Sequence, residues 1–455
     1  MSGRLIESLA TTPSLATLFS DESVLQAMLE FESALAQAEA RCGVIPKVAA
    51  DAITGAARPV HFDVSALADA AFRAGTPAIP LVSMLTDQLR KTDADAAGFV
   101  HWGATSQDVA DTAMSLLLKR AEPILGKDLL RLETALQGLS EGHKGSVMLG
   151  RTLLQPAPPV TLGLKAAGWL ASVCRGSRRL QKSFRAAAVL QFGGASGTLA
   201  ALGDRGISVA KELSAELGFG NSPATPWHTQ RDQLATFVCA CGVLTGSLGK
   251  MARDISLLMQ NEVGEAAESG GEGRGGSSTM PNKRNPTACV LTLAAAHRLP
   301  GLVASFLSAM PQEHERAVGG WQAEWPIVAA VVQSTGVAIA SMAEAAEGLS
   351  VDVEKMRFNI ENTNGAIFAE RAMILIGAKL GRDVALKILS SAVTKSVKEG
   401  RNLAAVLAEI PQVTIHISPA ELKQLETPEQ YLGSAEAFRK ALARESDRQD
   451  YDKEQ

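Results

Sequence analysis

The sequence has few aromatic residues and few cysteines. Tyr, Trp and Phe make up 4% of the 455 residues, and the five cysteines are scattered and odd in number. This usage argues against the disulfide framework of small secreted proteins, so we expect reduced thiols and a cytoplasmic location. Cys239 and Cys241 have no companion cluster of His or Cys, which argues against structural zinc.

Charge of one sign does not accumulate either. The 44 basic and 48 acidic residues give a net charge of -4 without a dense basic block, so we expect no nucleic-acid partner. The first ten residues carry Arg4 and Glu7 and lack the apolar core of a signal peptide. The long uncharged stretch 325–342 is interrupted by polar residues at 333–335. This interruption favours a buried helix over a membrane span, and we expect no membrane partner.

Alternating runs that would predict β-strands are scarce, whereas apolar residues recur every three or four positions over long stretches. This pattern predicts an all-α fold. About five long helices are expected, and their ranges are 111–144, 159–190, 231–265, 286–307 and 325–349.

The chain is long enough for more than one structural unit. Prolines divide both ends into shorter helical pieces. We therefore predict a three-part helical subunit, with an N-terminal helical domain at 1–110, a central bundle at 111–360 and a C-terminal helical domain at 361–455. The long helices are more apolar than one buried stripe requires, which predicts a helical homo-oligomer.

Glycine is concentrated in the segment GEAAESGGEGRGGSSTMPNKRNP, residues 264–286. Gly271 and Gly276 have the spacing of a phosphate-binding loop, but Ser277 stands where the lysine is needed and no strand precedes them. ATP binding is therefore excluded. The glycines at 193–197 likewise lack the strand of a dinucleotide-binding fingerprint.

The end of this segment, GSSTMPNKRNP, resembles the GSSxMPxKxNP signature of the fumarase/aspartase superfamily. The resemblance implies that Ser277 carries the proton of the carbon beside a substrate carboxylate. Lys283 would hold that carboxylate, and Ser278, Met280 and Asn285 would contact the substrate. A serine is a poor base at its ordinary pKa, so its alkoxide would need stabilisation by loop amides and by Lys283.

Two roles stay open for Asn285. It precedes Pro286 and is therefore placed to be a helix N-cap, either alone or together with a ligand contact. In both cases a helix N-terminus would point at the site and favour anions.

The sequence HWGATSQD, which begins at His101, resembles the first site segment of the same superfamily. The resemblance implies His101, Thr105, Ser106 and Gln107 as substrate ligands. Thr105 and Asp108 also match a capping box for the following helix, and His101 equally matches a structural histidine.

The sequence WHTQRD, which begins at Trp227, resembles a third site segment and offers Gln230 and Arg231 as ligands. Arg231 could instead pair with Asp232 at a helix start. In PQEHER, Arg316 is a further candidate cation with surface pairing as its alternative. His314 is a ligand, a substitute for the missing acid or a core histidine.

The second site segment reads GRTHxQ in most of the superfamily, and here it is GRTLLQ, with Leu153 in place of the histidine. Arg151 and Gln155 remain implied as substrate ligands. The glutamate that supports this histidine in lyases is replaced by Val290. Expulsion of water or an amine requires a proton donor, whereas a carboxylate, with a pKa near roughly 4, leaves without one.

The chain resembles the bacterial 3-carboxy-cis,cis-muconate cycloisomerases of the superfamily along nearly its whole length, including HWGATSQD, LQFGGASG at 190–197, PWHTQRD and PQEHER. The resemblance implies lactone formation from a small tricarboxylate in protocatechuate breakdown, without metal or organic cofactor, by a homotetramer whose active sites are shared between subunits. Two alternatives are an adenylosuccinate- or argininosuccinate-type lyase releasing fumarate and a non-catalytic, crystallin-like protein. The missing histidine and glutamate count against the first, and the intact Ser277 and Lys283 count against the second.

Overall fold

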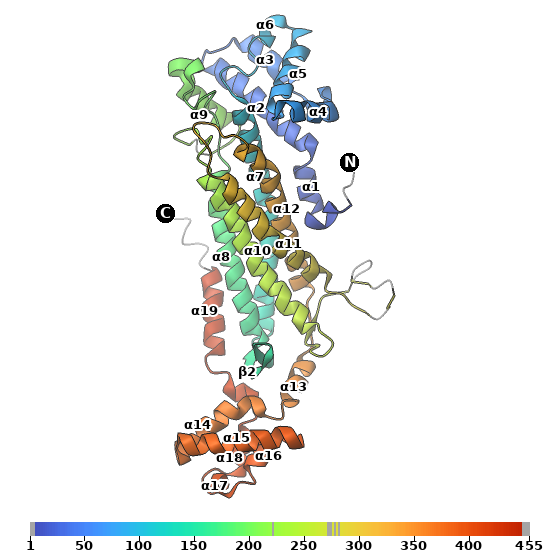
Figure 1. Ribbon diagram of the computed structural model, residues 1–455, viewed down its shortest axis with the longest axis vertical. Helices are drawn as coiled ribbons and strands as arrows, with labels where there is room; N and C mark the ends of the chain where they lie inside the picture. Colours follow the sequence, from blue (N-terminus) through green and yellow to red (C-terminus); the bar gives the residue numbers. More distant parts are fainter. Residues whose placement is uncertain (1–4, 221–222, 271–274, 277–278, 281–282, 448–455) are drawn as a thin grey trace. The chain divides into compact units, whose positions relative to one another are not determined.

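The computed structural model describes residues 5–220, 223–270, 275–276, 279–280 and 283–447. Within these residues the chain is predominantly helical (Figure 1). The five expected long helices are present, with ends that differ from the predicted ones by a few residues. They are α7 (Ser106–Gly142), α8 (Leu162–Ala187), α10 (Asp232–Leu258), α11 (Thr287–Ala309) and α12 (Gly320–Glu347).

Helix α7 illustrates why these stretches are helical. Buried residues recur along it every three or four positions, which places them on one face of a helix. They include Val109, Leu117, Leu125 and Leu132, each at most 2% exposed. The helix continues through Pro123.

Contacts between Cα atoms divide the chain into two compact units. Unit 1 comprises Met1–Leu129, Gly176–Gly249 and Leu291–Ser341, and unit 2 comprises Leu130–Arg175, Lys250–Val290 and Met342–Gln455. Each long helix contributes residues to both units. The sequence-based division at 110 and 360 stays a prediction.

The long helices contact one another through small and polar residues. In unit 1, Thr245 of α10 donates a hydrogen bond to Thr335 of α12, and a Cβ added to Gly249 of α10 would lie 2.7 Å from the Cβ of Ala296 in α11. In unit 2, Trp169 of α8 donates a 2.9 Å hydrogen bond to Asp254 of α10. Such close contacts require small residues at the crossing points.

The N-terminal part of unit 1 consists of shorter helices and 3-10 turns. They are η1 (Glu7–Ala10), α1 (Pro13–Leu18), α2 (Asp21–Arg41), α3 (Lys47–Ala56), η2 (Pro59–His61), α4 (Val64–Ala74), α5 (Ala78–Arg90) and α6 (Ala94–Ala97), followed later in the chain by η3 (Ala200–Arg205) and α9 (Gly206–Glu216).

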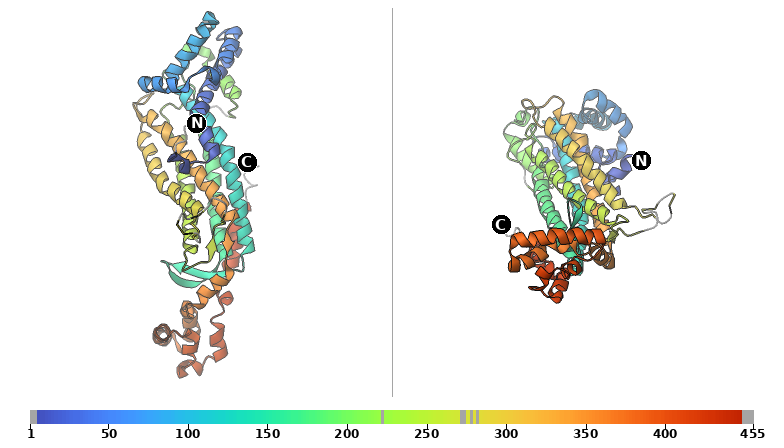
Figure 2. Two further views of the ribbon diagram at one scale, coloured as in Figure 1. Left: turned by 90° about the vertical axis from the view of Figure 1, so that its right-hand side faces the viewer. Right: turned by 60° about the horizontal axis from the view of Figure 1, so that its bottom comes forward.

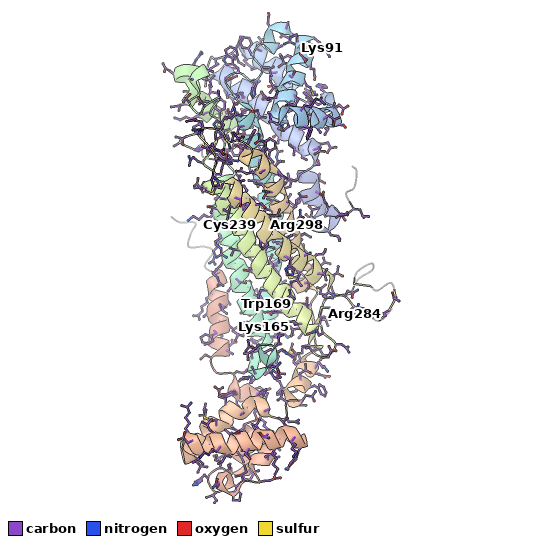
Figure 3. The ribbon with its side chains drawn as sticks, in the orientation of Figure 1. Lys91, Lys165, Trp169, Cys239, Arg284 and Arg298 are labelled. Carbon is purple, nitrogen blue, oxygen red and sulfur yellow. The ribbon has the colours of Figure 1, made fainter. Side chains whose placement is uncertain are left out.

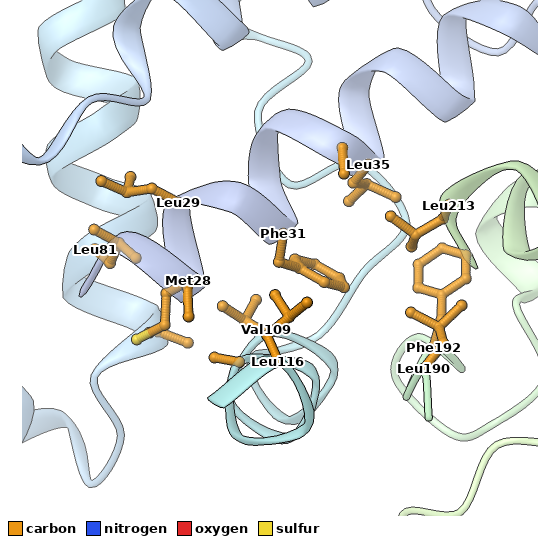
Figure 4. Close-up of a cluster of buried hydrophobic side chains, with 14 of the residues drawn as sticks. Met28, Leu29, Phe31, Leu35, Leu81, Val109, Leu116, Leu190, Phe192 and Leu213 are labelled. Atoms are coloured by element: carbon orange, nitrogen blue, oxygen red, sulfur yellow. The ribbon is translucent and has the colours of Figure 1, made fainter. Parts of the chain in front are cut away.

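The main core of unit 1 forms where α2 meets the first turns of α7 (Figure 4). Phe31 of α2 is fully buried beside Val109 and Leu116, and its ring centroid lies 6.5 Å from that of Phe192. Burial of one such side chain contributes roughly 1.5–3 kcal/mol. The core therefore fixes α2 against the helix that follows the HWGATSQD segment.

Unit 2 contains β-structure that the all-α prediction missed. Strand β1 (Val147–Thr152) pairs antiparallel with β2 (Gln155–Thr161), and β3 (Ala266–Ala267) pairs with β4 (Ser350–Val351). The predicted helix start at 159 was wrong because Pro159 lies in β2, and α8 begins only at Leu162. The two-residue strands β3 and β4 give too few alternations to be recognised, and prolines interrupt the strand pattern of β2.

In the C-terminal part of unit 2, several helices cluster around one apolar core (Figure 2). Leu389, Leu403 and Leu407 are among its buried residues. The helices of this cluster are α14 (Ala369–Leu380), α15 (Arg382–Glu399), α16 (Leu403–Leu407), α17 (Pro411–Thr414) and α18 (Pro419–Gln424). The chain enters the cluster through α13 (Val353–Glu361) and η4 (Ala366–Phe368) and continues after it as η5 (Pro428–Tyr431) and α19 (Ala435–Asp447).

By length and composition alone, α10, α11 and α12 could each cross a membrane. The most apolar windows of α10 and α12 are 61% and 67% buried within the structure, and that of α11 is 22% buried. The absence of a membrane partner stays a prediction.

Candidate functional site

The HWGATSQD segment leads into α7, which begins at Ser106. Arg316 donates hydrogen bonds to the hydroxyls of Thr105 at 2.6 Å and Ser106 at 3.0 Å. The Thr105 amide donates to Asp108 at 3.1 Å, which is one of the two bonds of a capping box. Three predicted substrate ligands, Thr105, Ser106 and Arg316, therefore lie together in unit 1.

The Asp108 carboxylate connects three segments that are distant in the sequence. It is fully buried and accepts hydrogen bonds from the amides of Gly193 at 3.0 Å and Gly194 at 2.9 Å. His228 Nε2 lies 2.8 Å from its Oδ1. Burial raises the pKa of Asp108, and the bonds from His228 and the two glycine amides oppose this shift.

The side chain of Gln107 is buried and joins the same segments as Asp108. It is 1% exposed, and its side-chain amide donates to the His228 carbonyl at 2.7 Å and to Asp111 at 3.1 Å. These contacts give Gln107 a role in joining the first and third segments, and its contact with substrate stays a prediction.

Arg231 forms a buried ion triad. Its guanidinium, 1% exposed, donates to Asp111 at 2.8 and 3.1 Å and to Glu324 at 2.6 and 2.9 Å. The Trp227 ring lies 4.6 Å from the guanidinium carbon. Burial would lower the pKa of Arg231, but the two carboxylates outweigh burial and raise it. Asp111 and Glu324 thus take the place of Asp232, the alternative partner considered for Arg231. Gln230 is exposed, and substrate contact by Gln230 and Arg231 stays a prediction.

His101, the first residue of the HWGATSQD segment, pairs with a carboxylate of α2. Its Nδ1 is 2.7 Å from Oε1 of Glu32, which is 1% exposed. The other histidine left open by the sequence, His314, accepts a hydrogen bond from Thr229 through its carbonyl at 3.0 Å. Both histidines have positive φ, 59° and 49°.

In unit 2, Arg151 binds Glu265 with two hydrogen bonds of 2.7 and 2.9 Å. Glu265 is fully buried and also accepts a 2.8 Å bond from Asn359. Gln155 is exposed at the start of β2. Arg151 is therefore engaged within the protein and remains 26% exposed.

Leu153, which stands where most of the superfamily has histidine, lies at the tip of the β1–β2 hairpin. Leu153 and Leu154 form its two-residue turn, with φ of 52° and 64°, and are 96% and 74% exposed. Such dihedrals are uncommon for side chains larger than glycine. Neither leucine carries a proton that it could donate.

A lysine that the sequence analysis overlooked lies near Arg151. Lys165 and Trp169 lie one turn apart on α8 (Figure 3). Burial lowers the pKa of Lys165, and Asp254 opposes this shift. Its position after the hairpin was visible in the sequence, but nothing there indicated burial.

Of the signature segment, Ser277 and Ser278 lie outside the described residues. Met280 and Lys283 are exposed, and the Lys283 amide donates to the Met280 carbonyl at 3.1 Å. Arg284 is exposed as well (Figure 3).

Glu268, and not Asn285, caps α11. Its carboxylate, 8% exposed, accepts from the amides of Ala288 at 3.0 Å and Cys289 at 2.9 Å. Asn285 instead donates its backbone amide to Gly275 at 2.9 Å and its side-chain amide to Gly276 at 3.3 Å. The expected attraction of a substrate anion to this helix end is therefore wrong for these two amides, because the protein's own carboxylate occupies them.

Sequence reasoning missed most of the buried partners in these networks, which are Glu32, Asp111, His228, Glu265, Glu268 and Glu324, and it selected Asp108 only as a helix cap. A signal existed for Glu32, since it continues the buried face of α2 that contains Leu25, Met28 and Leu35. A carboxylate on an apolar helix face indicates a buried partner. The described residues contain no group of three or more His, Cys, Asp or Glu side chains that could hold a metal.

Comparison with known families matches residues 7–301 to a family described as "Lyase" and residues 365–442 to one described as "Adenylosuccinate lyase C-terminus". The first match covers more than half of the chain. The chain belongs to this lyase family of the fumarase/aspartase superfamily, which confirms the identification made from the signature segment.

Among its relatives, the chain is 47% identical to a 3-carboxy-cis,cis-muconate cycloisomerase of Bradyrhizobium diazoefficiens, over 92% of each protein. It is 40% identical to a nitrosuccinate lyase of Streptomyces davaonensis, over 95% of this chain and 93% of that one. The solved structure of the 3-carboxy-cis,cis-muconate lactonizing enzyme from Pseudomonas putida matches with a TM-score of 0.91 at 42% identity, covering 98% of this chain and 99% of that one.

Proposed function

We propose that this protein is a 3-carboxy-cis,cis-muconate cycloisomerase of the protocatechuate pathway. One substrate carboxylate adds to the double bond within the same molecule, and Ser277 transfers a proton at the adjacent carbon to give 4-carboxymuconolactone. The observation that carries this proposal is the combination of an intact Ser277 and Lys283 with apolar residues, Leu153 and Val290, at the two positions of the missing acid.

The chemistry agrees with this combination. In the reverse direction the leaving group is a carboxylate, which departs without a proton donor because its pKa is low. The exposed, apolar hairpin turn at Leu153 offers no such donor. Lys283 would offset the charge that develops on the neighbouring carboxylate as the carbon loses its proton. The relatives at 41–47% identity named as cycloisomerases support the same substrate.

The proposal includes a small tricarboxylate as the only substrate, a cytoplasmic location and a homotetramer with active sites shared between subunits. The predicted ligands are divided between the two units of one chain. Thr105, Ser106 and Arg316 lie in unit 1, and Arg151 and Lys283 lie in unit 2.

The test is to mix the purified full-length protein with 3-carboxy-cis,cis-muconate and follow the loss of the diene's ultraviolet absorbance. Ser277→Ala should abolish turnover and leave the helical circular dichroism unchanged. No loss of absorbance with the wild-type protein would overturn the substrate, and an active Ser277→Ala variant would overturn the proton carrier.

A second candidate is a lyase acting on a substituted succinate, which the 40% identity to a nitrosuccinate lyase favours. It is tested in parallel by incubating the protein with nitrosuccinate, adenylosuccinate and argininosuccinate. Release of fumarate from any of the three, with nitrite as the second product of nitrosuccinate, faster than muconate turnover, would replace the cycloisomerase assignment.

A further inference from the structure

A buried carboxylate of α2 contacts the first predicted substrate ligand. Oε1 of Glu32 lies 2.7 Å from Nδ1 of His101, and the Glu32 side chain is fully buried while that of His101 is 18% exposed. The backbone of His101 has a φ of 59°, a conformation that costs energy for a residue with a side chain. A strained, partly exposed histidine with a buried carboxylate partner points to a functional arrangement rather than to simple packing.

The contact determines which ring nitrogen can face a ligand. Since a carboxylate accepts hydrogen bonds, Nδ1 of His101 must carry a proton, and Nε2 is the nitrogen left for another partner. When the ring is protonated, Nε2 is a charged donor suited to a carboxylate. When the ring is neutral, Nε2 becomes an acceptor and would repel one.

The charges around His101 favour the protonated ring. Burial would lower the pKa of His101, but the charge and hydrogen bond of Glu32, together with the charge of Asp108, outweigh burial and raise it. Glu39 lies two turns beyond Glu32 on α2, and burial raises its pKa to about 9, so it is neutral near pH 7. Glu32 and Asp108 are thus the two carboxylates that act on His101.

Cations for a tricarboxylate are scarcer in the structure than in the sequence. Arg231 is enclosed by Asp111 and Glu324, and Arg151 is bound by Glu265. Both guanidinium groups therefore have carboxylate partners within the protein. A protonated His101 would supply a further positive charge in unit 1, in addition to Arg316, which donates to Thr105 and Ser106.

We propose that Glu32 is a positioning residue that holds His101 in the orientation and charge state in which Nε2 donates to a carboxylate of the substrate. The inference rests on the proposed function, because it assigns the ligand of His101 as a carboxylate of the tricarboxylate. His101 then has both of the roles that the sequence left open. Its contact with Glu32 is structural, and this contact orients Nε2 toward the substrate.

The first test follows His101 itself and needs no turnover. The seven histidines are labelled with carbon-13 in the ring, and the resonance of His101 is assigned by its loss in His101→Gln. Glu32→Gln should move the titration of this resonance to lower pH. Glu39→Gln, on the same buried helix face, should leave it in place because Glu39 is already uncharged.

Tricarballylate, an unreactive saturated tricarboxylate, serves as the ligand. It should shift the His101 resonance and its titration to higher pH in the wild-type protein, and bind about tenfold or more weakly to Glu32→Gln. Unchanged His101 titration in Glu32→Gln, or a resonance that tricarballylate leaves unmoved, would overturn the proposal. If Glu32→Gln does not fold, Glu32→Asp retains the charge at a longer distance and should give a smaller shift in the same direction.

The second test is kinetic. Activity that requires protonated His101 is lost as the pH rises, so Glu32→Gln should move this limb of the kcat/KM profile to lower pH and raise KM more than it lowers kcat. An unchanged profile counts against the proposal. If the wild-type protein does not turn over the muconate, the proposed function fails, while the tricarballylate titration still decides the role of Glu32.

Discussion

Asp108 and His228 form a buried pair, with Oδ1 of Asp108 2.8 Å from Nε2 of His228 and side-chain exposures of 0% and 4%. The same carboxylate accepts the amides of Thr105, Gly193 and Gly194. One side chain thereby fixes the start of α7, the glycine-rich turn after α8 and the segment before α10. In unit 1, the orientation of Thr105 and Ser106 depends on this carboxylate.

Asp108→Asn should therefore lower both stability and activity. An amide nitrogen in place of one carboxylate oxygen would face amide donors, so at least one hydrogen bond is lost in a buried place. We expect a loss of roughly 2–4 kcal/mol in the free energy of unfolding, measured by urea denaturation, with a fall in kcat/KM. Asp87→Asn, at an exposed position of α5, is the control and should unfold at the wild-type urea concentration. Wild-type stability of Asp108→Asn would show that the carboxylate is not needed as the common acceptor.

Variants of Arg231 can distinguish a structural role in the buried ion triad from a role in substrate binding. Arg231→Met would leave Asp111 and Glu324 buried without their cation, which should cost roughly 3–5 kcal/mol of unfolding free energy. Arg253→Met, at an exposed position of α10, the helix that begins directly after Arg231, is the control and should have little effect.

The conservative variant then tests the ligand role implied by the resemblance. Arg231→Lys keeps the positive charge and loses the paired geometry, so a structural Arg231 predicts a moderate loss of stability with kcat/KM almost unchanged. A large fall in kcat/KM at wild-type stability would instead favour direct contact with the substrate.

The cap that Glu268 provides for α11 should affect the signature segment, which lies directly before this helix. Glu268→Gln weakens the cap of α11, because a neutral amide accepts one hydrogen bond less readily and loses the interaction with the helix dipole. We expect a loss of about 1–2 kcal/mol and a fall of about tenfold in kcat, since the capped turn directly follows Lys283 and Asn285. Glu262→Gln, an exposed control six residues earlier, should change neither quantity. A variant with wild-type kcat despite reduced stability would separate the cap from catalysis.

The sequence predicted the parts of the fold that have long periodic patterns. The five long helices follow from apolar spacing, and the superfamily follows from the length and specificity of GSSTMPNKRNP. The β1–β2 hairpin was missed because its second strand contains Pro156, Pro158 and Pro159, which read as breaks rather than as an exposed strand.

The sequence indicated several residues of the candidate site but few of the contacts that these residues make. Motifs indicated Thr105, Ser106 and Arg316, which the structure brings together. The partners that neutralise Arg151 and Arg231 come from distant segments, and no local pattern in a single sequence reveals such pairs. The same holds for Glu32, which lies 69 positions before His101.

Glu39 gives the stability of the fold a specific pH dependence. Both of its carboxylate oxygens are buried without a hydrogen-bond partner among the described residues, and burial raises its pKa from 4.5 to about 9. Below pH 4.5 the carboxyl is protonated in the folded and unfolded chains alike, so it costs nothing. Between pH 4.5 and 9 only the unfolded chain releases the proton, so the stability present at low pH is progressively lost.

Replacing Glu39 should remove this loss. Glu39→Gln cannot ionise, so its free energy of unfolding should exceed that of the wild type by roughly 1–3 kcal/mol at pH 7 and approach it near pH 4.5. The measurement is urea denaturation at a series of pH values, with Asp21→Asn at an exposed position of α2 as the control. A difference between Glu39→Gln and the wild type that stays constant from pH 4.5 to 9 would mean that Glu39 is ionised in the folded chain. In that case a second negative charge would act on α2 beside the Glu32–His101 pair.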